Sequence, residues 1–207
     1  MAEPAIRLLD DDAVMLRRTG VRFPIELRPA GVSVDEPSTW PAAEGRLELV
    51  EGRLLYMPPC ADIQQDVAVD VVHLLRTWSE SHAGFVVGGN EAGMKLGADI
   101  RAADAAVWLR AAVGPSVGRL RHAPPLLAVE VAGQDEDEPV LRDKAAWYLR
   151  QGVLVVWLVL PESREVVVMR AGGSESRHGA QGRLLPEPQL PELAPEVSRF
   201  FQQLDGA

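Results

Sequence analysis

The segment Leu126-Leu-Ala-Val-Glu-Val131 is an apolar run with one acidic residue, Glu130, in its middle. An earlier run, Ala103-Asp-Ala-Ala-Val-Trp108, has the same character and carries Asp104. Strands this apolar are normally buried on both faces of a sheet. A segment with helical periodicity follows and contains Lys144, one of only two lysines beside nineteen arginines. Two acids on buried strands and a lysine on the next helix indicate a site as well as a fold.

Hydrophobic periodicity along the chain predicts a mixed α/β domain, with one central sheet flanked by helices. Strands 46–50 and 53–57 form a hairpin around Glu51-Gly52. Helices are expected over 62–81, with Asp62 as N-cap and Gly84 as stop, and over 140–150. A turn is expected at Gly88-Gly89. The other predicted strands are 85–87, 94–96, 104–109, 126–131, 154–160 and 165–170.

Prolines divide the chain into an arm and a domain. Five prolines interrupt residues 1–41, and no helical period survives there. We therefore expect an N-terminal extension over 1–40 and a single domain over 41–207. A proline-rich tail is expected to run over the surface to a short terminal helix.

Composition excludes several classes of protein. No run approaches the roughly 18–20 apolar residues of a membrane span, and no signal pattern opens the chain, so we expect a cytoplasmic protein. The single Cys60 excludes an intrachain disulfide and a multi-cysteine zinc site. A net charge of −9 counts against tight non-specific nucleic-acid binding, although a local arginine-lined cleft remains possible.

The acids at Asp104 and Glu130 favour a divalent cation. Two buried carboxylates on neighbouring strands would repel each other, and an ion between them removes that cost. Mg²⁺ takes oxygen ligands and keeps several waters, so one or two carboxylates suffice. Lys144 falls in the apolar stripe of its helix with Val140, Trp147 and Tyr148, and so should face the sheet. Glu48 alternates with leucines in the hairpin and could face the same way.

The residues alone leave simpler interpretations open. Asp104 could cap the end of a strand or pair with an arginine. Glu130 and Lys144 could form a purely structural salt bridge, and Lys144 could extend to solvent from the edge of its stripe.

Taken together, these segments resemble the Uma-two family of restriction endonucleases, within the PD-(D/E)XK nuclease superfamily. The resemblance covers roughly residues 40–204 and rests on the segments 46–59, 103–104, 127–131, 144–148, 151–153 and 156–161. It implies a restriction-endonuclease-like core and an endonuclease that hydrolyses phosphodiester bonds of nucleic acid. By implication Glu48, Asp104, Glu130 and Lys144 are catalytic, with Lys144 a catalytic lysine that has migrated to the following helix. Asp104, Glu130 and the Val131 carbonyl would hold Mg²⁺ or Mn²⁺.

The sequence departs from the family pattern at three places. Ala103 stands where a proline is usual, Gln64 where a histidine is frequent, and Ala132-Gly133-Gln134 where Ser-Pro follows the strand. The acidic run 135–138 would repel a nucleic-acid backbone, so we expect only weak or local contact with DNA. The alternative function is a non-catalytic binding or assembly protein that keeps the nuclease fold. A homodimer is expected, because nucleases that act on two strands often pair and symmetric dimers are the commonest oligomers.

Overall fold

The computed structural model describes residues 24–27, 36–40, 45–133 and 136–205. The chain divides into two compact units, the first formed by residues 1–59 with 98–101 and the second by 60–97 with 102–207. Most of the predicted N-terminal arm lies outside the described residues.

The first unit is built on the predicted hairpin. Strands β2 (Arg46–Val50) and β3 (Arg53–Met57) pair antiparallel, with Val50 opposite Arg53. The two loop residues, Glu51 and Gly52, both have positive φ (52° and 75°), as a type I′ turn requires. The hairpin is therefore confirmed. Two short elements had not been predicted here: strand β1 (Ile25–Leu27), which pairs with β3, and the 3₁₀ helix η1 (Pro37–Thr39).

The second unit contains a mixed sheet. Strand β5 (Asp99–Leu109) pairs antiparallel with β6 (Leu127–Val131), and β6 pairs parallel with β7 (Val155–Leu160). The sheet continues antiparallel through β8 (Glu165–Arg170) and β9 (Glu175–His178), while β4 (Phe85–Leu96) pairs with β5. The first residues of β5 belong to the first unit, where Ile100 lies opposite Leu49 of β2.

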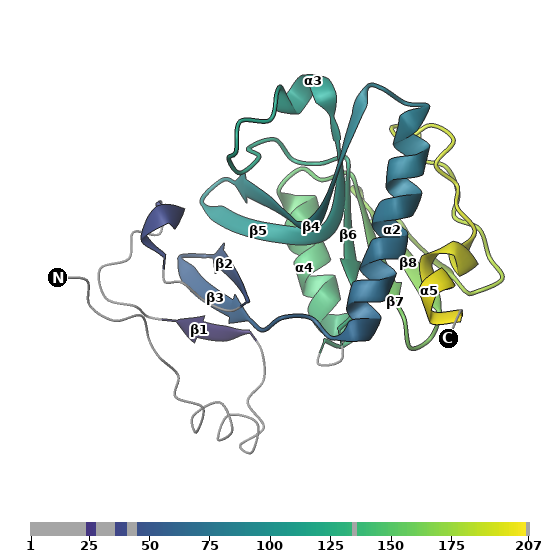
Figure 1. Cartoon of the computed structure of the whole chain (residues 1–207), viewed down its shortest axis with the longest axis horizontal. Coiled ribbons are helices and arrows are strands. Elements are labelled where there is room, and N and C mark those ends of the chain that lie inside the picture. Colours follow the sequence, from purple (N-terminus) through teal and green to yellow (C-terminus); the bar gives the residue numbers. More distant parts are fainter. Residues whose placement is uncertain (1–23, 28–35, 41–44, 134–135, 206–207) are drawn as a thin grey trace, which may run out of the picture. The chain divides into compact units, whose positions relative to one another are not determined.

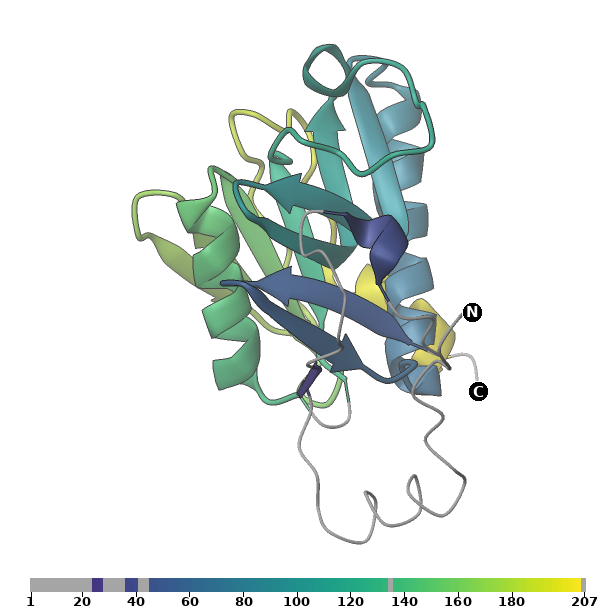
Figure 2. The same cartoon turned by 90° about the vertical axis from the view of Figure 1, so that its left-hand side faces the viewer.

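Helices cover both faces of this sheet, as predicted (Figure 1). The long helix α2 (Asp62–Glu80) and η2 (Val197–Phe201) share one apolar core with alternate residues of β5 to β8. Helix α4 (Glu138–Arg150) closes a second core on the opposite face (Figure 2). Two short helices complete the unit: α3 (Arg110–Val113) after β5 and α5 (Gln202–Asp205) after η2.

The predicted turn at Gly88-Gly89 is wrong, because both glycines lie inside one continuous strand, β4. A Cβ at Gly88 would come 2.8 Å from a ring atom of Trp108, and one at Gly89 would come 2.5 Å from Cγ2 of Val72. Both contacts are too close for a side chain. The glycines therefore admit bulky neighbours on the two faces of the strand, a role glycine also has in strands.

The helix ends differ from the prediction by a few residues. Ala61, not Asp62, is the N-cap of α2, and the Asp62 carboxylate instead accepts a hydrogen bond from the N–H of Ile63 at 2.7 Å. Helix α4 begins two residues earlier than predicted because the Asp137 carboxylate caps it, accepting from the N–H of Val140 at 3.2 Å. No helix in the described part of the chain is long and apolar enough to span a membrane.

Candidate active site

Lys144 lies on the buried face of α4. The helix buries Leu141, Lys144, Ala145, Trp147 and Tyr148 against the sheet, and Lys144 is only 5% exposed. This orientation confirms that the lysine faces the sheet. The predicted stripe was wrong at Val140, which is 43% exposed, and Leu141 takes its place in the core.

Glu130 receives two hydrogen bonds from α4. Lys144 Nζ donates to Glu130 Oε2 at 2.6 Å, and the Tyr148 hydroxyl donates to Oε1 at 2.7 Å. Glu130 is 1% exposed, so its carboxylate is stabilised by protein groups such as these rather than by bulk water. Lys144 and Tyr148 are four residues apart and stand one turn from each other on the same helix face. One helix therefore holds both oxygens of the carboxylate.

Asp104 lies where the pairing of β5 and β6 gives way to a side-chain contact. The ladder ends at the pair Ala105 and Val129, and extending this register by one pair sets Asp104 opposite Glu130. At the next position the Asp104 carboxylate accepts from the N–H of Val131 at 2.7 Å. The backbone N–H of the residue after Glu130 thus donates to a side chain instead of to a backbone carbonyl.

The carbonyl of Val131 is also held by a side chain. Gln64, in the first turn of α2, donates from Nε2 to this oxygen at 3.0 Å and is 9% exposed. A Cβ on Gly133 would come 2.8 Å from Oε1 of Gln64, so the absence of a side chain at Gly133 makes room for the amide. Side chains from β5 and α2 therefore fix both polar groups of one peptide residue beside Glu130.

Glu48 belongs to the first unit, whereas the other predicted site residues belong to the second. It is fully buried and forms ion pairs with Arg101 at 2.9 Å and Arg46 at 3.5 Å. These two ion pairs are enough to explain the buried carboxylate of Glu48 by a structural role. Its catalytic role stays a prediction.

The oxygen donors of the second unit suit a hard divalent cation. The carboxylates of Asp104 and Glu130 and the carbonyl of Val131 are the ligand types that Mg²⁺ and Mn²⁺ prefer. Within the described residues, no group of three or more His, Cys, Asp and Glu side chains could hold a metal. A cation bound here would therefore need the backbone carbonyl and water to complete its ligand shell.

A network of charged side chains fastens α4 to the sheet. Arg142 forms ion pairs with Glu138 at 2.8 Å and with Glu175 of β9 at 2.7 Å, while Arg177 bonds to Glu138 and to Glu165 of β8. The hydrogen bond from Arg177 lowers the pKa of Glu138, and that from Arg142 lowers the pKa of Glu175. Glu138 is part of the acidic run expected to repel nucleic acid, and this network compensates its charge.

Sequence reasoning missed two side chains of this site. Tyr148 had been assigned to the apolar stripe, yet its hydroxyl is a site contact, and its spacing of four from Lys144 was the available signal. Gln64 had been noted only as a departure from a family pattern. Nothing local to α2 indicates that it reaches the carbonyl of Val131, sixty-seven residues away.

Comparison with solved structures found a protein of the same fold. A crystal structure of a putative nuclease belonging to DUF820 from Anabaena variabilis matches with a TM-score of 0.74 at 17% sequence identity. The match covers 84% of this chain and 99% of the other. At this identity the similarity establishes the fold, which confirms the predicted class.

Comparison with curated proteins found no match. The family model of Uma2, described as putative restriction endonuclease, matches residues 34–200. This match covers most of the chain and confirms the predicted resemblance. The protein is therefore a member of the Uma2 family of putative restriction endonucleases.

Proposed function

We propose that this protein is a Mg²⁺- or Mn²⁺-dependent endonuclease that hydrolyses phosphodiester bonds of nucleic acid, with DNA as the expected substrate. The observation that carries the proposal is a pair of contacts on adjacent residues of β6: Lys144 bonds to Glu130, and Asp104 bonds to the N–H of Val131. Membership of a family of restriction endonucleases supports the nuclease class.

Asp104, Glu130 and the carbonyl of Val131 would hold the cation. When bound, the ion supplies a more nucleophilic water and stabilises charge on the phosphate. Gln64 orients the Val131 carbonyl, and the N–H of Val131 fixes the Asp104 carboxylate. The hydroxyl of Tyr148, on α4, orients the Glu130 carboxylate. The Val131 carbonyl and Glu130 are thereby held by side chains outside the ligand set, as is usual for ligands of ordered metal sites.

Lys144 would position the attacking water and stabilise the developing negative charge. In the hydrolysis the water oxygen forms a bond to phosphorus, one ester P–O bond breaks, and the leaving oxygen takes up a proton. The burial of Lys144 beside Glu130 keeps its ammonium group at the carboxylate, within reach of a water bound there. Glu48 would act as a helper acid, as the resemblance implies.

A plasmid-nicking assay in Mn²⁺ tests this proposal. We expect nicking by the wild-type protein and its loss in Asp104→Asn, because the amide still accepts the Val131 N–H but carries no charge. Asp143→Asn, an exposed aspartate on α4, is the matched control and should nick normally. Equal nicking by the wild type and Asp104→Asn would reject the assigned site.

The second candidate is a non-catalytic binding or assembly protein with the nuclease fold. One observation favours it: both oxygens of Glu130 already accept hydrogen bonds from protein groups. Calorimetric titration with Mn²⁺ separates the two. Binding that Asp104→Asn abolishes supports the enzyme, and absence of binding by the intact protein supports the scaffold.

A cytoplasmic homodimer completes the proposal, since enzymes that cut both strands of a duplex often act as pairs. Light scattering after size exclusion should give twice the mass of the 22.5 kDa chain. A monomer mass would reject the dimer without affecting the assignment of the site.

A further inference from the structure

We infer that the segment Arg110–His122, named here the basic loop, is the surface that contacts the nucleic-acid backbone. This inference rests on the proposed function and assigns it a substrate-binding surface. The segment joins β5 to β6 and begins with α3 (Figure 1).

The sequence around the loop has an unusual charge pattern. Residues 105–129 contain three arginines and one histidine but no aspartate or glutamate, in a chain whose net charge is −9. Asp104 and Glu130, the two proposed metal ligands, flank this acid-free stretch. The connection between the strands of the two proposed ligands is therefore positively charged in an otherwise acidic chain.

The arginines of the loop differ from most of those elsewhere in the described structure. Each of the following forms an ion pair with a carboxylate: Arg53, Arg76, Arg142, Arg164, Arg170, Arg177 and Arg183. In the described chain, Arg110, Arg119 and Arg121 form no such pair. Arg110 donates to the neutral carbonyls of Ala83 and Phe85, both at 2.9 Å. The positive charge of the loop is therefore not cancelled by neighbouring acids.

Arg121 lies on the same side of the sheet as the candidate site. Its guanidinium group stands 4.8 Å from the ring centroid of Trp108, a stacking that suits arginine. Trp108 belongs to the core that α4 closes, together with Leu141 and Tyr148. Arg119 is exposed, two residues away. The stacked Arg121 is held in place, whereas the Arg119 side chain forms no hydrogen bond or ion pair within the described residues.

The spacing suits a bound duplex. Asp104 and the end of β5 at Leu109 are five residues apart, roughly 17 Å in a strand. This distance corresponds to roughly five base steps at 3.4 Å each. Phosphates on one duplex can thus lie at the loop and at the site together. Arginine is suited to such contacts by its planar, permanently charged group.

Fluorescence anisotropy with a labelled duplex in EDTA tests the inference, because no cleavage takes place without metal. We expect Arg119→Glu to weaken binding by on the order of tenfold, and to reduce the slope of log K against log salt by about 0.9 per lost phosphate contact. Arg121→Ala should add a similar loss. Arg121→Lys keeps the charge without the planar group and should retain most of the affinity. Thermal melting checks that each variant is folded.

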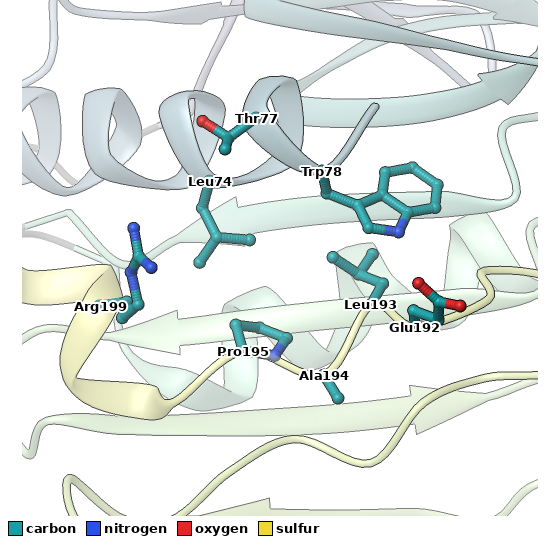
Figure 3. A pocket seen from close by; sticks show the side chains of 8 residues that line it. All are labelled: Leu74, Thr77, Trp78, Glu192, Leu193, Ala194, Pro195 and Arg199. Carbon is teal, nitrogen blue, oxygen red and sulfur yellow. The ribbon is translucent and has the colours of Figure 1, made fainter. Parts of the chain in front are cut away.

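Arg199→Glu is the matched control. Arg199 is exposed, forms no ion pair in the described chain, and lines a pocket between α2 and residues 192–195 (Figure 3). It lies with the core on the α2 side, away from Trp108. Its reversal changes net charge as much as Arg119→Glu does, and we expect a much smaller effect on affinity.

Three results would overturn the inference: equal losses for Arg119→Glu and Arg199→Glu, unchanged binding in the double variant Arg119→Glu/Arg121→Ala, or binding of anionic lipid vesicles but not of the duplex. The test is separable from that of the nuclease. If the loop variants weaken duplex binding but the wild type does not nick DNA in Mn²⁺, the proposed chemistry is rejected and the binding surface stands. If the wild type nicks DNA and the loop variants nick it equally well, the nuclease stands and the binding surface is rejected.

Discussion

Lys144 Nζ lies 2.6 Å from Glu130 Oε2, and the two residues are 5% and 1% exposed. A buried pair like this one is costly to break, because removing one partner leaves an uncompensated charge away from water. The same contact joins the helix to the strand and sets the lysine beside the proposed metal ligand.

Removing the lysine alone should destabilise the protein strongly. We expect Lys144→Met to lower the free energy of unfolding by about 3–5 kcal/mol, since Glu130 stays buried without its cation. The double variant Glu130→Gln/Lys144→Met should recover most of the loss while remaining unable to nick DNA. Urea denaturation of the wild type, Lys144→Met, Glu130→Gln and the double variant measures both the loss of stability and its recovery. Strictly additive losses would mean that the two side chains do not interact.

Removing the Tyr148 hydroxyl should destabilise the protein less than removing the Lys144 ammonium group. Tyr148→Phe keeps the ring in its T-shaped contact with Trp147 and removes one hydrogen bond to a charged acceptor. We expect about 1.5–3 kcal/mol of destabilisation and weaker Mn²⁺ binding, because Glu130 then has a less defined orientation. Tyr56→Phe in the first unit serves as a chemical control for Mn²⁺ affinity. An Mn²⁺ affinity equal to wild type in Tyr148→Phe would remove the hydroxyl from the site.

A methyl group at Gly133 should displace Gln64. The added Cβ would lie 2.8 Å from Gln64 Oε1 and 3.3 Å from a carboxylate oxygen of Glu136, and the amide end can move away. We expect Gly133→Ala and Gln64→Ala each to weaken Mn²⁺ binding severalfold, with no further loss when combined. Gly84→Ala, where a Cβ meets nothing within 4 Å, should bind normally. Calorimetric titration with Mn²⁺ measures the affinity of each variant. Additive losses of Mn²⁺ affinity in the double variant would show that Gly133 and Gln64 act separately.

Acid should weaken the attachment of α4. The pKa of Glu138 is lowered by Arg177 and that of Glu175 by Arg142, so both carboxylates are more acidic in the folded state than in the unfolded chain. Their stabilisation is complete above the ordinary glutamate pKa of 4.5 and is lost as pH falls through the lowered values. Urea midpoints measured from pH 7 down to pH 3 should fall more steeply for wild type than for Glu138→Gln/Glu175→Gln. Parallel curves would contradict this contribution.

Much of the framework follows from local sequence. Glu51-Gly52 supplies the two positive φ angles of the hairpin, and the unbroken apolar run up to Val131 is typical of a strand buried on both faces. The helical periodicity of the sequence over α4 was sufficient to predict that Lys144 faces the sheet. These features depend on residues within a few positions of one another, and they were predicted correctly.

The features that failed depend on tertiary contacts. Gly88-Gly89 has the sequence of a turn, and only Trp108 and Val72 explain why it is part of a strand. Val140 and Leu141 are both apolar, and only the docking of α4 decides which of them is buried. The contact of Gln64 with Val131 likewise depends on how α2 packs beside β6. Such choices are made by packing, which periodicity does not encode.

A crystal structure of the protein soaked with Mn²⁺ would show whether Asp104, Glu130 and Val131 hold the cation. We predict an anomalous peak bound by the carboxylates of Asp104 and Glu130 and by the Val131 carbonyl, absent from Asp104→Asn crystals soaked in the same way. Mn²⁺ bound elsewhere, or no peak with Lys144 still paired to Glu130, would contradict the assignment of this site as a metal centre.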